Sequence, residues 1–226
     1  MKRNTFQIAT IAVATLGTTT QSCVALATTS VGLTVLKQIL LGGITKGFNI
    51  FSDKNNFLNN QLIDDALPSQ LRDMNSTLHK MGLSHLVKKE KEFIAEAAAF
   101  TVNTSRPILI NAVNSLSAED AARIVQGGSG SATQLLKERT SAQLMSAIAP
   151  KVEQELNKYG IVKTINTALS GSNLLGTLLG GGNNNNNVNA GGLSMLASEQ
   201  IVNGLFNIIE DHEKQNSASL LGPFGK

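Results

Sequence analysis

The stretch SAEDAARIVQGGSGSATQLLKERTSAQLMSAIAP, residues 117–150, carries the densest helix signals in the chain. Ser117 is a good N-cap, and Asp120 stands three residues later, at the capping-box position. Gly127 and Gly128 end that helix, because glycine enters the left-handed conformation at little steric cost. The order of these signals predicts a helix, a tight turn and more helix, and therefore favours an all-helical fold.

After the turn, we expect a short helix over residues 132–137 and a new helix that Thr140 caps and that continues to residue 159. Gln143 stands at the capping-box spacing from Thr140. Flexible backbone followed by a helix N-terminus can hold an anion. The alternative is a corner in which the glycines only make the turns. The GxxxxGK[ST] pattern of a phosphate loop is absent from this stretch.

Apolar residues three or four apart mark the other helices. We expect these over residues 33–51, 69–82, 83–105, 107–116, 161–169 and 193–212. Ser69 should cap the second of them, Phe100 should face inward in the third, and Pro107 should start the fourth. Residues 54–68 are rich in Asn, Asp and Pro, which predicts an irregular loop pinned to the body by its apolar residues.

Composition limits the possible functions. The chain has 226 residues, no Trp, one Tyr and a formal net charge of +3. The charge excess is too small to propose nucleic acid as a partner. The oxygen-rich residues of the 54–68 loop do not follow the order of a calcium-binding EF-hand, and no HExxH zinc motif occurs. We therefore expect no metal and no cofactor.

The N-terminus is typical of an export signal. A basic start at Lys2 and Arg3 precedes a short apolar core over residues 8–16, which is too short to span a bilayer. Two processing routes remain open. Ser22-Cys23 is similar to the end of a bacterial lipobox, which would make Cys23 a lipidated N-terminus. The sequence ALA at residues 25–27 alternatively fits cleavage by ordinary signal peptidase.

Three ordered blocks resemble domain-of-unknown-function family 4197, a family of uncharacterised bacterial envelope proteins. The first is FLNNQLIDDALP at residues 57–68, the second lies within residues 120–140, and the third is NGLF at residues 203–206. The resemblance covers roughly residues 33–213. It implies an all-helical exported or lipid-anchored domain, and it implies no reaction. The matching residues are Phe57, Leu58, Asn59, Asn60, Ile63, Leu67, Pro68, Asp120, Ala121, Gly127, Gly128, Ala132, Thr133, Gln134, Thr140, Ile201, Asn203, Gly204, Leu205 and Phe206.

The expected organisation is a single compact bundle of about seven to nine helices with an N-terminal signal segment. A lipoprotein-type signal peptide covers residues 1–22, and a tether covers residues 23–32. The all-helical domain covers residues 33–213, with a flexible Gly/Asn-rich insert at 171–192. A tail follows at residues 214–226.

The expected function is that of a non-catalytic binding or structural module, exported to the periplasm and lipid-anchored to a membrane at Cys23. Its partner would be an envelope protein or a small-molecule ligand. The alternative is an unrecognised envelope hydrolase or lyase that uses Asp120 and its neighbours. The motif residues are Asn, Thr, Gln and Gly more than groups suited to proton transfer. The predicted groove residues are Asn59, Asn60, Asp120, Gly127, Gly128, Thr133, Gln134, Arg139 and Thr140.

Overall fold

Nine α-helices and no strand form the part of the chain that the computed structural model describes, residues 30–169 and 190–217. The all-α expectation is confirmed. The predicted signal peptide, Cys23 and most of the Gly/Asn-rich insert lie outside the described residues. The helices are α2 (Ser30–Phe51), α3 (Lys54–Leu58), α4 (Gln61–Asp65), α5 (Ser69–Lys80), α6 (Ser84–Asn114), α7 (Ala118–Gly127), α8 (Ser131–Lys158), α9 (Ile161–Leu169) and α11 (Ala190–Asn216).

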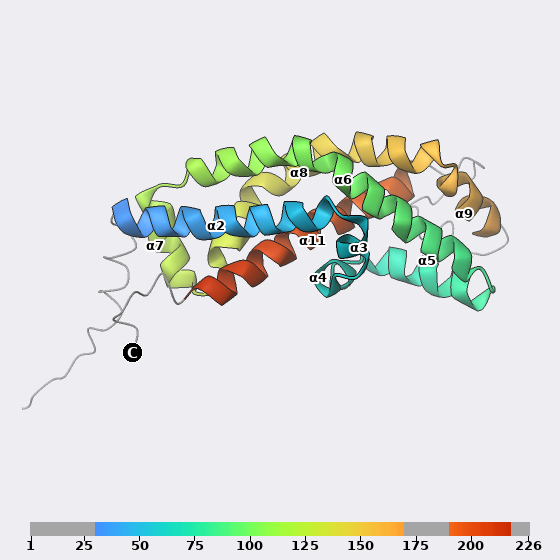
Figure 1. The fold of residues 1–226 in the computed structure, drawn as a ribbon, viewed down its shortest axis with the longest axis horizontal. Helices are drawn as coiled ribbons and strands as arrows, with labels where there is room; N and C mark the ends of the chain where they lie inside the picture. Colours follow the sequence, from blue (N-terminus) through green and yellow to red (C-terminus); the bar gives the residue numbers. More distant parts are fainter. Residues whose placement is uncertain (1–29, 170–189, 218–226) are drawn as a thin grey trace, which may run out of the picture.

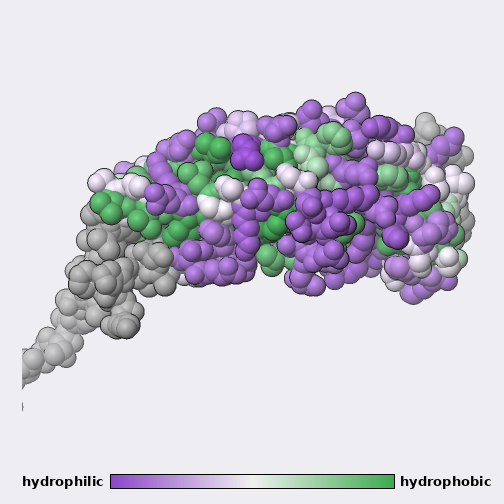
Figure 2. All heavy atoms as spheres, viewed as in Figure 1, coloured by the Kyte–Doolittle hydropathy of each residue, from purple (hydrophilic) through white to green (hydrophobic). Residues whose placement is uncertain are grey.

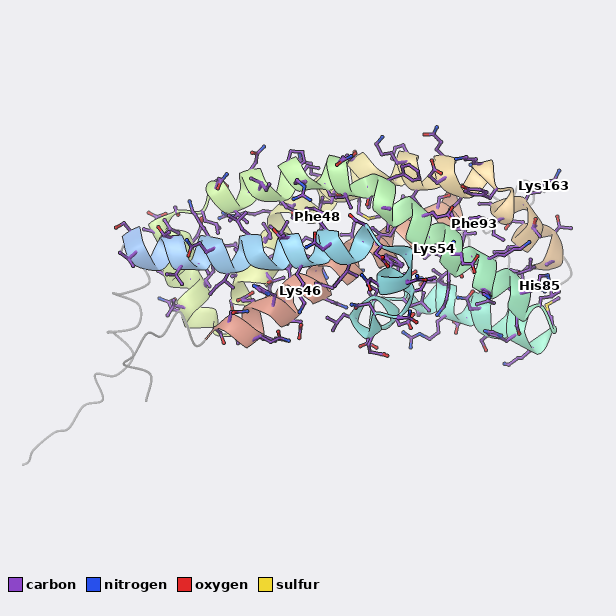
Figure 3. The ribbon with its side chains drawn as sticks, viewed as in Figure 1. Lys46, Phe48, Lys54, His85, Phe93 and Lys163 are labelled. Carbon is purple, nitrogen blue, oxygen red and sulfur yellow. The ribbon has the colours of Figure 1, made fainter. Side chains whose placement is uncertain are left out.

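Helix α11 is the central element, and it packs against α8, α2 and α4 (Figure 1). Helix α6 in turn packs on α8 and α2, so four long helices enclose one hydrophobic core. Phe48 of α2 is buried in this core with the guanidinium of Arg106 4.8 Å from the centre of its ring (Figure 3). Lys46, two residues before Phe48 in α2, pairs with Asp211 of α11 at 3.0 Å.

Glycines let α2 and α11 approach each other closely. A Cβ atom at Gly43 would lie 3.1 Å from the backbone Cα of Ile209, and one at Gly47 would collide with the buried side chain of Leu205. These two glycines lie one turn apart on the face of α2 that meets α11. The close packing of the two helices therefore offsets the low helix propensity of the glycines.

The expectation of an irregular loop over residues 54–68 is wrong, because most of it forms α3 and α4. The Asp53 carboxylate accepts a hydrogen bond from the Asn56 amide at 2.8 Å, and the Asn60 side chain accepts one from the Leu62 amide at 3.0 Å. The Asp and Asn residues that favour turns therefore also start short helices as N-caps.

Residues 84–114 form one helix, which corrects the prediction of two helices separated at Pro107. Pro107 and Asn103 are both exposed, so the Asn103 carbonyl that loses its helical partner can be hydrated. Phe100 is 56% exposed and does not face the core, contrary to expectation. Leu109 and Val113, beyond the proline, continue the buried stripe.

Residues 131–158 likewise form a single helix, so Thr140 does not cap a new one. Its hydroxyl donates to the Leu136 carbonyl at 2.7 Å, and this bond to the preceding turn lets a threonine sit inside a helix. Ser69 is not a cap either: it is the first residue of α5, and Pro68 occupies the N-cap position without a side-chain hydrogen bond. The predicted end of the long helix near Tyr159 and the short helix α9 are confirmed.

Hydrophilic side chains cover the part of the surface over α3, α4 and α5 in the view of Figure 2, while hydrophobic residues show where α2 begins. None of the helices in the described residues is long and apolar enough to cross a membrane.

Candidate functional site

The start of α7 carries the predicted capping box. The Asp120 amide donates to the Ser117 hydroxyl at 3.2 Å, and the Ser117 amide donates to the Asp120 carboxylate at 3.0 Å. Arg139 of α8 adds a bidentate ion pair to the same carboxylate, at 2.9 and 2.5 Å. The Arg139 hydrogen bonds, helped by those of Ser117, lower the pKa of Asp120 to about 2. This carboxylate ties α7 to α8 and is a poor proton acceptor near neutral pH.

The turn between α7 and α8 depends on two glycines with positive φ, Gly128 at 79° and Gly130 at 90°. A residue with a Cβ is strained in both conformations. Ser129 stands between them, and Ser131 is the first residue of α8. The turn aims the first free amides of α8 at the end of α11.

A carboxylate of the chain itself occupies the predicted anion position at this helix N-terminus. Glu213 of α11 is 1% exposed. One of its oxygens accepts the amides of Gly130 and Ala132, both at 3.1 Å. The other accepts the amide and the hydroxyl of Thr133, at 2.7 and 2.6 Å. Four donors and the positive end of the helix dipole balance the buried charge, so Glu213 locks the turn to α11.

A groove runs beside this lock, between α8 and α11, with a cavity volume of about 310 Å³. We call it the α8–α11 groove. Most of its side chains are polar, with Phe206 as an apolar exception. Its lining consists of Gly127, Ser129, Gly130, Ser131, Thr133, Gln134, Lys137, Phe206, Asn207 and Glu210.

Several of these groups are already oriented by contacts within the chain. The Lys137 ammonium lies 5.9 Å from the centre of the Phe206 ring. Glu210 pairs with Lys214, and the Asn207 amide donates to the Leu62 carbonyl at 3.0 Å. The groove is lined by two parts of the sequence, residues 127–137 and 206–210, and the Asn207 bond connects the second of them to α4.

Two of the predicted groove residues, Asn59 and Asn60, lie outside this lining. Asn60 caps α4, and the Asn59 amide donates to the Asn55 carbonyl at 2.9 Å. The segment touches α11 through Ile63, which lies 3.3 Å from the position of a Cβ on Gly204. The structure therefore gives the two asparagines roles in the α3–α4 segment.

Arg139 and Thr140 line a different hollow, of about 590 Å³, between α8 and residues 107–115 at the end of α6. Lys137 and Arg139 are two residues, or about 200°, apart around the helix, so they face opposite sides of α8. The predicted set thus separates into two groups. Gly127, Thr133 and Gln134 line the α8–α11 groove, while Asp120, Arg139 and Thr140 belong to the α6–α7–α8 side, and Gly128 shapes the turn.

Sequence reasoning missed the contribution of α11: Glu213, Phe206, Asn207 and Glu210. One signal was present. Glu210, Asp211 and Glu213 place negative charge near the C-terminus of a helix, where the dipole disfavours it. Such a cluster needs a compensating partner, and for Glu213 that partner is the N-terminus of α8.

A family model described as "Protein of unknown function (DUF4197)" matches residues 27–218, most of the chain. The chain belongs to the DUF4197 family. The suspected resemblance is thereby confirmed, and in this DUF4197 chain all three blocks that suggested it lie on helices or their connections within the described residues. No curated protein and no solved structure matches the chain.

Proposed function

We propose that this DUF4197 chain is a non-catalytic binding module of the bacterial cell envelope. Its α8–α11 groove would hold a small polar ligand or a segment of an envelope protein. The observation that carries the proposal is the Glu213 lock, which fixes the turn at residues 127–131 as one rim of the groove. A rim held before binding lowers the entropic cost of recognition.

The chemistry of the lining supports binding. Ser129, Ser131 and Gln134 offer hydrogen-bond donors and acceptors, and Lys137 adds one positive charge. A volume of about 310 Å³ falls at the lower end of the usual range for small-molecule pockets. The alternative, a hydrolase or lyase using Asp120, has no specific observation in its favour, because Arg139 and Ser117 occupy that carboxylate.

The proposal includes an envelope location. It rests on the export-type N-terminus and on Cys23 at a lipobox-like position. The intact mass of the chain purified from its own cell envelope tests this directly. A mature chain that starts at a diacylated Cys23 supports a lipid anchor, a chain that starts at residue 28 indicates a soluble periplasmic protein, and an unprocessed chain contradicts export.

The same preparation tests binding. Native mass spectrometry of the gently purified chain should show an added mass that is lost on denaturation. Gln134→Ala and Lys137→Ala should remove the added mass, because both side chains line the groove.

Matched controls lie on the exposed surface of the same helix: Gln154→Ala and Lys151→Ala should keep the added mass. For a protein partner, a photo-crosslinker at position 134 should capture it and one at position 154 should not. Equal capture from both positions, or an added mass that survives the groove substitutions, would contradict the proposed site.

A further inference from the structure

The contact between α5 and α6 contains a fully buried carboxyl group. Glu90 of α6 is 0% exposed, and neither of its oxygens has a hydrogen-bond partner. Asn75 of α5 is also buried; its amide lies near enough to the Glu90 carboxyl to influence it, but the two do not meet in normal hydrogen-bond geometry. An ionised carboxylate without hydrogen bonds is very costly to bury, whereas a protonated one costs much less.

The surroundings of Glu90 favour its protonated form. Burial raises the pKa of Glu90 from 4.5 to about 8, against smaller lowering effects of the Asn75 amide and the Lys91 charge. Lys91 points to α4, where it pairs with Asp64 at 3.1 Å. The charged residues that α5 and the adjacent part of α11 carry are exposed: Arg72, Asp73, His79, Lys80 and Glu199.

Helix α5 lies at the edge of the bundle and joins the core through a single short face. It packs against α6 and α11 through one short stripe, Leu71, Met74, Asn75 and Leu78. Pro68 precedes it, and Gly82, with φ 76° and open space around it, follows it. The connections, residues 66–68 and 81–83, are the positions about which α5 would turn as a unit.

We propose that α5 is a pH-operated cover. It stays docked on α6 while the Glu90 carboxyl keeps its proton, and it undocks when that proton passes to water. Undocking hydrates the new carboxylate and the Asn75 amide together. It also exposes an apolar face formed by the α5 stripe and by Leu86 and Val87 of α6. This cover is separate from the α8–α11 groove and does not depend on the proposed function.

Hydrogen–deuterium exchange of the full chain, read by peptide between pH 5 and pH 8, tests the proposal. After correction for intrinsic exchange rates, the equilibrium constant for opening of residues 69–80 should increase about tenfold per pH unit, because one proton is released on opening. In Glu90→Gln, which is neutral at every pH, exchange of the same residues should lose this dependence. Glu90→Met provides a second neutral variant of similar length should the glutamine variant not fold.

Glu153→Gln, at an exposed position of α8, is the control and should behave as the wild type. The cover proposal is overturned if Glu90→Gln keeps the wild-type pH dependence. It is also overturned if exchange in peptides of α2 and α11 increases with pH by the same factor as exchange in α5. Glu90 would then act on the stability of the whole fold.

Discussion

Glu213 shows how a single side chain can connect distant parts of this fold. Its carboxylate is buried, yet it accepts hydrogen bonds from three backbone amides and one hydroxyl that lie 80 to 83 residues away in sequence. It supplies the capping that no residue near the start of α8 provides, because the N-cap is Gly130. Buried charge is tolerated here because every donor and acceptor is matched.

Glu213→Gln should destabilise the chain by about 3 kcal/mol, because the amide group loses the charge and turns one oxygen into a donor that faces other donors. Urea denaturation followed by circular dichroism at 222 nm measures the change. Glu210→Gln on the same helix removes an ion pair with the exposed Lys214, which solvent screens, and should change stability little. Equal effects of the two substitutions would contradict the assigned lock.

Asp120 contributes to the loss of stability of the fold at low pH. Its pKa is lowered to about 2, so its ion pair stabilises the native state above the unfolded-state pKa near 4 and is lost as the pH falls toward 2. Because Arg139 is more than a third exposed, solvent screens the pair and we expect roughly 1–2 kcal/mol. Asp120→Asn should lower stability at pH 6 and flatten its decrease between pH 4 and 2. If the melting temperature of Asp120→Asn fell between pH 4 and 2 as steeply as that of the wild type, this role would be excluded.

Local residue chemistry was the most predictable part of the site. The Ser117–Asp120 capping box and the glycine turn follow from spacing alone, because both partners lie within a few residues. The partner of Thr133 could not be predicted, since nothing local to residue 133 points to residue 213. A single sequence carries the pattern of a contact only when both sides lie in the same element.

At the scale of elements, α2 and α11 meet through glycine. Gly43→Ala should destabilise the chain by about 1–3 kcal/mol, since its Cβ meets backbone atoms of Ile209 that cannot move aside. Gly42→Ala is the matched control: its Cβ would lie 2.6 Å from the His212 ring, but this partly exposed side chain can rotate away. The gain in helix propensity should then leave the variant neutral or slightly stabilised. Thermal unfolding of both variants decides the point. A stable Gly43→Ala would rule out the close approach.

Helix boundaries were harder to predict than helix existence. α9 and the end of α8 follow from periodicity and from Gly160, which has φ 63°. The sequence offers the same local signals at Pro107 and Thr140, yet both residues lie inside long helices. Tertiary packing of the buried stripe through both positions outweighs the local cost, and that packing is invisible to a local pattern.

At the scale of the whole molecule, α11 closes the core. It packs against α8, α2 and α4 and contributes Ile201, Leu205, Phe206, Ile208 and Ile209 to the buried cluster. A chain that ends at residue 189 should therefore lack cooperative thermal unfolding and show poorly dispersed amide resonances. Deletion of residues 218–226 is the control and should preserve cooperativity. A folded chain without α11 would disprove its central position.

The Glu213 lock also has a consequence for the order of events during synthesis. Among the groups that it joins, Glu213 leaves the ribosome last, so synthesis must pass residue 213 before the start of α8 is capped and the bundle can close. Contacts between residues this far apart slow folding. If the chain is exported as proposed, such a delay would keep it unfolded long enough to pass through a secretion channel.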